Sequence, residues 1–197
     1  MQKASSGFGF ATVLQFVEKN TAQFDESHDV NHALSVYKNA LEIANSEYPE
    51  YDHQIILYSS MLHDVCDHKY TNCIKKSELD DFIKTNLSFE KANIVIDIIE
   101  NLSYSKEIRG QRKNVHPPYL DIVSDADRIE AIGETGINRC IAYTKATQGI
   151  VPGDVVTHCH EKLLRLYNDG YIKTKKGRAM AEPLHKIIEE YVNVHGA

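Results

Sequence analysis

The segment MLHDVCDHKY, residues 61–70, places several kinds of ionisable side chain directly behind the apolar run IILYSSML. Its His-Asp pair, His63 and Asp64, comes at the end of what the spacing of apolar residues predicts to be a buried helix. A buried carboxylate without a partner is costly, and a divalent cation would remove that cost. Mixed nitrogen and oxygen ligands suit first-row metals such as Mn, Fe, Co, Ni or Zn.

Two further ionisable residues fall on apolar rows of predicted helices. His32 lies one helical turn before Val36, and Asp127 lies one turn after Val123. Asp125 lines up with polar residues instead, although it remains the alternative to Asp127. The sequence therefore predicts that three helices direct these two residues and the His-Asp pair to one interior.

Each of these residues, taken alone, has a common structural explanation. A lone histidine on an apolar helix face is usually a hydrogen-bonded core residue. Asp127 could cap a helix or pair with Arg128 or Arg139, and a His-Asp dipeptide often ends a helix. Only the combination of the residues indicates a metal site.

Helical spacing recurs along the whole chain and strand-like alternation is almost absent, which predicts an all-α fold. The polar stretch at 103–118 is the longest predicted irregular segment, and substrate contacts are expected there. No linker divides the chain, so a single domain is expected over residues 1–197.

Ser27 or Asp29 should cap the second predicted helix and Ser88 the fifth, and a break is expected near Gly133. The predicted helices span about 9–24, 29–46, 52–66, 77–86, 88–103, 119–144, 154–168 and 178–194.

Composition narrows the class of function. The 197 residues carry a formal net charge of −6, which disfavours binding to nucleic acid because that affinity comes from concentrated Lys and Arg. No apolar run approaches the roughly 18 residues of a membrane span, and the N-terminus lacks a signal-peptide core. The four cysteines form no CxxC pair, so no zinc knuckle is indicated. A cytoplasmic protein is expected.

The order His, His-Asp, Asp resembles the HD-domain superfamily of metal-dependent phosphohydrolases. The similarity is most detailed to the bacterial and viral branch that includes manganese-dependent nucleoside triphosphate pyrophosphohydrolases. It runs from about residue 27 to 182 and implies a helical HD-domain bundle with one metal ion in its core. The segments that carry it are SHDVNHALSV, MLHDVCDHKY, NLSYSK, SDADRIEAIGETGINR and HEKLLRLYNDGYIKTKKGRAMAE.

The resemblance also implies a ligand set. It prefers His32 over His28, because the family has an apolar residue four positions after its ligand. The chain lacks the additional histidines of dinuclear relatives, so one ion is expected, with manganese first and Co, Ni, Fe, Mg or Zn as alternatives. Ser35 stands where the family usually has arginine, which puts a phosphate-side contact in doubt. The implied metal ligands are His32, His63, Asp64 and Asp127.

Asp67 follows the His-Asp pair by one turn, and an acid at that offset serves as the base in some HD hydrolases. Pairing with Lys69 or ending the helix are equally good explanations for it. Phosphates also need cations beyond the metal, although a solvated surface role is common for exposed Lys and Arg. The cations expected to bind phosphate are Lys69, which matches the family's HDxxDxK pattern, then Lys106 and Arg109 from the polar stretch, and Arg128.

The resemblance thus implies a hydrolase that splits (deoxy)nucleoside triphosphates into monophosphate and pyrophosphate. A nucleoside monophosphate phosphatase or a cyclic-nucleotide phosphodiesterase would use the same ligands. A catalytically weak sensor module that binds metal or nucleotide is the alternative outside the enzymes. The expected partner is a small nucleotide, without nucleic acid or membrane, and a homodimer is left open.

Overall fold

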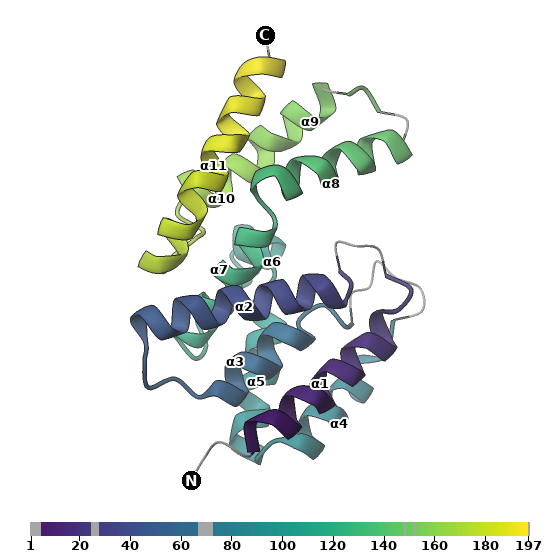
Figure 1. Ribbon diagram of the computed structural model, residues 1–197, viewed down its shortest axis with the longest axis vertical. Coiled ribbons are helices and arrows are strands. Elements are labelled where there is room, and N and C mark those ends of the chain that lie inside the picture. Colours follow the sequence, from purple (N-terminus) through teal and green to yellow (C-terminus); the bar gives the residue numbers. More distant parts are fainter. Residues whose placement is uncertain (1–4, 25–27, 67–72, 148, 152, 197) are drawn as a thin grey trace. The chain divides into compact units, whose positions relative to one another are not determined.

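The structure is a computed structural model that describes residues 5–24, 28–66, 73–147, 149–151 and 153–196. Within these ranges every regular element is a helix, which confirms the all-α prediction (Figure 1). The chain divides into two compact units, one ending at Ser124 and the other beginning at Asp125. The boundary falls inside α7 (Tyr119–Glu130). The single-domain expectation stays a prediction.

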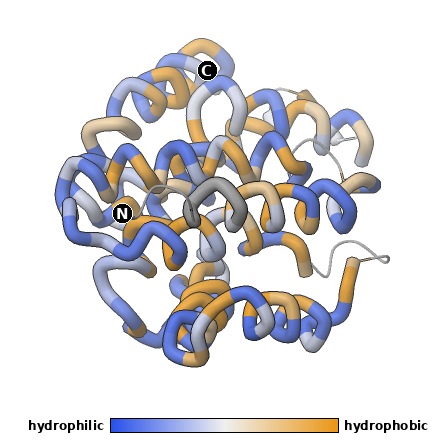
Figure 2. The backbone as a smooth tube through the Cα atoms, turned by 60° about the horizontal axis from the view of Figure 1, so that its bottom comes forward, coloured by the Kyte–Doolittle hydropathy of each residue, from blue (hydrophilic) through white to orange (hydrophobic). Residues whose placement is uncertain are grey.

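The first unit is built around α3 (His53–Leu62), which packs against α1 (Ser5–Thr21), α2 (Val30–Glu47) and α5 (Phe89–Asn101). Every residue of α3 from Ile55 onward is buried, as expected for a helix that is apolar on nearly all sides. Hydrophobic and hydrophilic residues alternate along the helices of the chain, the pattern of amphipathic helices (Figure 2). The unit also contains α4 (Lys76–Asn86), α6 (Tyr104–Ile108) and the first half of α7.

Two helix starts in this unit follow the predicted caps. The side chain of Asp29 accepts hydrogen bonds from the backbone N–H groups of Asn31 and His32 at the start of α2. Ser88 accepts one from the backbone N–H of Lys91 in α5. Such side-chain acceptors satisfy donors that the first helical turn leaves without a partner. Ser27, the other candidate cap, lies outside the described residues.

The second unit consists of α8 (Gly133–Ala146), α9 (Gly153–His158), a π-helical turn (Cys159–Leu163), α10 (Leu164–Asn168) and α11 (Lys175–His195). Helix α8 packs against α9 and α11. The predicted break occurs at Gly133, whose φ of +72° favours glycine. A Cβ there would lie 3.0 Å from Cδ2 of Leu184, so a larger residue would also crowd α11.

Several boundaries differ from the predictions. Helix α1 spans Ser5–Thr21 rather than about 9–24. Helix α3 ends at Leu62 rather than near Cys66, so the His-Asp pair occupies the turn that follows the helix. The stretch predicted to be irregular contains the short helix α6, and α11 begins at Lys175 instead of 178. No helix among the described residues combines the length and the apolar character that crossing a membrane requires.

Arg112 holds the polar stretch in place. Its side chain is only 6% exposed; Nη2 lies 2.8 Å from Oδ1 of Asp121 on α7, and Nη1 binds the carboxylate of Glu107 on α6. A guanidinium can bind two carboxylates at once because its donors form a planar fork. One cation of this stretch, Arg112, therefore has a clear structural role.

Arg112→Met should lower the free energy of unfolding by about 2–3 kcal/mol, because it removes the buried cation that both carboxylates share. Urea unfolding followed by circular dichroism measures this. Arg165→Met is a matched control, since Arg165 forms an exposed ion pair with Asp169 and should cost less than about 1 kcal/mol. Equal losses in the two variants would contradict the role of Arg112.

Candidate metal centre

Three imidazoles surround one carboxylate in the first unit. Oδ2 of Asp64 lies 3.1 Å from Nε2 of His63, 3.5 Å from Nε2 of His32 and 3.9 Å from Nε2 of His28. One ring nitrogen of His32 and one of His63 also lie within 4.8 Å of each other. We refer to these four residues as the histidine cluster. Its nitrogen and oxygen atoms are close enough together for several of them to bind one ion.

The cluster is assembled from two helix ends. His32 lies in the first turn of α2, where the Asp29 cap fixes the backbone, and its side chain is 4% exposed. His63 follows the last residue of α3 and its side chain is 1% exposed. Asp64, with 29% of its side chain exposed, is the most exposed member of the cluster. Burial of the two imidazoles follows from the apolar helix faces that carry them.

A hydrogen bond fixes the ring of His63. Its Nδ1 lies 2.8 Å from the carbonyl oxygen of Ser60, and because a carbonyl only accepts, Nδ1 must donate. In a neutral imidazole this leaves the lone pair on Nε2, the atom that faces Asp64. Metal-binding histidines commonly show this arrangement, in which the second nitrogen donates to a carbonyl and orients the ring.

The surroundings of Asp64 favour its ionised form. Burial is the largest influence on its pKa and acts to raise it, but His63 and His32, helped by His28, outweigh burial and hold the pKa well below its usual value. Asp64 therefore offers an anionic oxygen at neutral pH. A carboxylate beside two imidazoles is a donor set that fits a first-row divalent metal ion.

The two candidate acids of α7 differ in their surroundings. Asp125 is fully buried and accepts hydrogen bonds from the backbone N–H groups of Lys173 and Thr174, at 2.9 and 2.6 Å, where α11 begins. Burial raises the pKa of Asp125 to about 6, against the effect of those hydrogen bonds. Asp127 is half-buried and belongs to the second unit. Its place as the fourth ligand stays a prediction.

The remaining predicted site residues are placed as follows. Asp67 and Lys69 lie outside the described residues. Lys106 is exposed and donates to the carbonyl of Glu100, 2.6 Å away, and Arg109 is an exposed residue at the end of α6. Arg128 is 3% exposed and donates to the backbone carbonyl of Tyr171. That bond is structural, so a contact of Arg128 with phosphate stays a prediction, as do the roles of the other cations.

His28 is the member of the cluster that the sequence did not predict. The resemblance favours His32 over His28, because the family has an apolar residue four positions after its ligand and Val36 follows His32 at that spacing. The segment SHDVNH nevertheless indicates that His28 could join the cluster, since His28 and His32 lie on either side of the Asp29 cap. A residue just before a helix start can reach the same point as one in its first turn.

Comparison with known proteins supports a family assignment. No protein-family model matches the chain. The chain is 31% identical to the uncharacterised protein YpgQ of Bacillus subtilis over 180 residues, which cover 85% of this chain and 83% of YpgQ. The crystal structure of YpgQ in complex with ADP matches with a TM-score of 0.75 and 26% identity, covering 95% of this chain and 93% of that one.

An HD-superfamily hydrolase from Bacillus thuringiensis shares the fold, with a TM-score of 0.73 and 23% identity over 95% of both chains. The relationship to YpgQ extends over most of both proteins. The chain therefore belongs to the same family as YpgQ and has the fold of an HD-superfamily hydrolase.

Proposed function

We propose that the protein hydrolyses nucleoside triphosphates to nucleoside monophosphate and pyrophosphate, using one divalent metal ion, with manganese the first choice. The observation that carries the proposal is the histidine cluster, in which imidazole nitrogens from two helix ends meet the ionised Asp64. The complex of the relative YpgQ with ADP supports a nucleotide as the ligand.

Three residues of the cluster, His32, His63 and Asp64, would hold the ion together with Asp127. Two observations support Asp127. It lies one helical turn beyond the fully buried Val123 on the continuous helix α7, and both oxygens of the alternative, Asp125, already bind the start of α11. When bound, a divalent ion supplies a Lewis acid that offsets negative charge on the reacting phosphoryl group.

The reaction requires a water molecule in line with the leaving oxygen. The water oxygen forms a bond to the α-phosphorus, the bond from that phosphorus to the bridging oxygen breaks, and pyrophosphate leaves. Asp67 would accept the proton that the water gives up. Cationic side chains would offset the charge of the other phosphates, and the candidates are Lys69, Lys106, Arg109 and Arg128.

A panel of nucleotides tests the proposal. With manganese, the purified protein should release pyrophosphate and monophosphate in equal amounts from nucleoside triphosphates, and a chelator should stop the reaction until manganese is restored. Phosphate release from monophosphates alone would indicate a phosphatase, and opening of cyclic nucleotides would indicate a phosphodiesterase. Stoichiometric metal binding without turnover of any nucleotide would contradict the proposal and favour a sensor.

A further inference from the structure

We infer that His28 binds a phosphate oxygen of the substrate at the solvent-facing edge of the metal centre. The inference rests on the proposed function and extends it to a residue that the predicted ligand set leaves unused. It assigns His28 to the substrate and not to the metal ion.

The distances around Asp64 separate His28 from the two predicted histidine ligands. Two ligand atoms at right angles about an octahedral ion, with bonds of roughly 2.1 Å, lie roughly 3.0 Å apart. Nε2 of His63 and Nε2 of His32, at 3.1 and 3.5 Å from Oδ2 of Asp64, are close to that value. Nε2 of His28, at 3.9 Å, is farther away and also beyond hydrogen-bonding distance of this oxygen.

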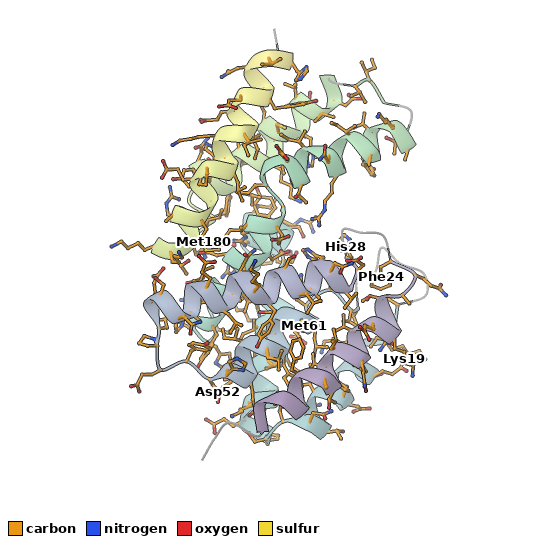
Figure 3. All side chains as sticks on the ribbon, viewed as in Figure 1. Lys19, Phe24, His28, Asp52, Met61 and Met180 are labelled. Carbon is orange, nitrogen blue, oxygen red and sulfur yellow. The ribbon has the colours of Figure 1, made fainter. Side chains whose placement is uncertain are left out.

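The exposed fractions of the side chains also distinguish His28 from His32 and His63. The side chain of His28 is 17% exposed, against 4% for His32 and 1% for His63. A substrate reaches the centre from solvent, so its phosphates meet the exposed edge first. That edge is formed by His28 and by Asp64, which is 29% exposed. Figure 3 labels His28 beside the end of α2 at which the helix begins.

The backbone next to His28 is fixed. The following residue, Asp29, caps α2 through Oδ1, and its Oδ2 accepts a hydrogen bond from the side chain of Asn31 at 2.9 Å. The ring of His28 lies 6.1 Å from that of His32 between centroids. A donor whose backbone is already ordered loses less conformational entropy on binding than one on a long, mobile side chain.

The chemistry of imidazole suits this role. A neutral imidazole carries one N–H donor and a protonated one carries two, so His28 can donate to a phosphate oxygen in either form. Hydrolysis of a triphosphate needs such donors beyond the metal ion, because charge builds up on the departing pyrophosphate.

Isothermal titration calorimetry of the manganese-loaded protein tests the inference, with inorganic pyrophosphate and a methylene-bridged ATP analogue as probes. His28→Ala should bind both probes about ten- to a hundredfold more weakly, the effect of one hydrogen bond to a charged group. His28→Gln should recover part of the loss, because its amide can donate. Manganese affinity should stay within about twofold of the wild type. His160→Ala, which changes an exposed histidine of the second unit, should leave all three affinities unchanged.

Two results would overturn the assignment: a loss of manganese affinity in His28→Ala as large as that in His63→Ala, or unchanged affinity for both probes. A wild type that splits no triphosphate but binds pyrophosphate through His28 would refute the proposed function alone. A wild type that splits triphosphates while His28→Ala binds both probes normally would refute the inference alone. A wild type that binds neither probe would refute both.

Discussion

Asp64→Ala is expected to bind manganese roughly a hundredfold more weakly than the wild type and to hydrolyse nucleotides roughly a thousandfold more slowly. The physical reason is the position of its carboxylate. Asp64 supplies the negative charge to which His28, His32 and His63 are all turned, and these histidines keep it ionised. Without it, Asp127 would be the only carboxylate left in the proposed ligand set, and neutral imidazoles offset a divalent charge poorly.

Calorimetry with manganese measures the loss of metal affinity. An assay of pyrophosphate release measures the loss of hydrolysis rate. Asp64→Asn keeps the volume of the side chain and should show nearly the same losses, which separates the missing charge from any change in packing. Asp81→Ala, which changes an exposed aspartate of α4, is the matched control and should behave as the wild type. Metal binding and activity that survive in both Asp64 variants would show that the centre lies elsewhere.

The second large effect should distinguish the two acids of α7. Asp125→Asn replaces one acceptor oxygen by an amide NH2, which would face the backbone N–H groups of Lys173 and Thr174. We expect it to lower the free energy of unfolding by about 2–4 kcal/mol, because Asp125 and Thr174 are buried and their polar groups cannot turn to water. Manganese binding of the folded variant should not change.

Asp127→Asn should show the opposite pattern. Its stability without metal should stay within about 1 kcal/mol of the wild type, because it is half-buried, while manganese affinity falls by roughly a hundredfold. Chemical unfolding and calorimetry on the two variants give both numbers. If Asp125→Asn loses metal and Asp127→Asn keeps it, the fourth ligand has been assigned to the wrong residue.

Local patterns predicted much of the fold. His32 is buried beside Val36 because both lie on the apolar row of α2, and Asp29 and Ser88 cap the helices at which the sequence placed them. The break at Gly133 was visible for a similar reason, since glycine adopts a positive φ without strain. Each of these features depends on residues within one or two helical turns.

Features that depend on distant residues were not predictable in the same way. The carboxyl of Asp125 looked like part of a polar row, yet it is fully buried because it holds Lys173 and Thr174 at the start of α11. Helix α6 is only five residues long, too short for an apolar period to show, and Arg112 fixes it through a contact with α7. No periodicity in the sequence encodes such tertiary contacts.

The central claim is that His32, His63 and Asp64 bind one metal ion. A structure of crystals grown with manganese, with anomalous diffraction recorded near the manganese absorption edge, tests it most directly. We predict one anomalous peak, within roughly 2.0–2.3 Å of a nitrogen of His32, a nitrogen of His63 and an oxygen of Asp64. A peak bound to other residues, or no peak in a protein that hydrolyses nucleotides, would contradict it.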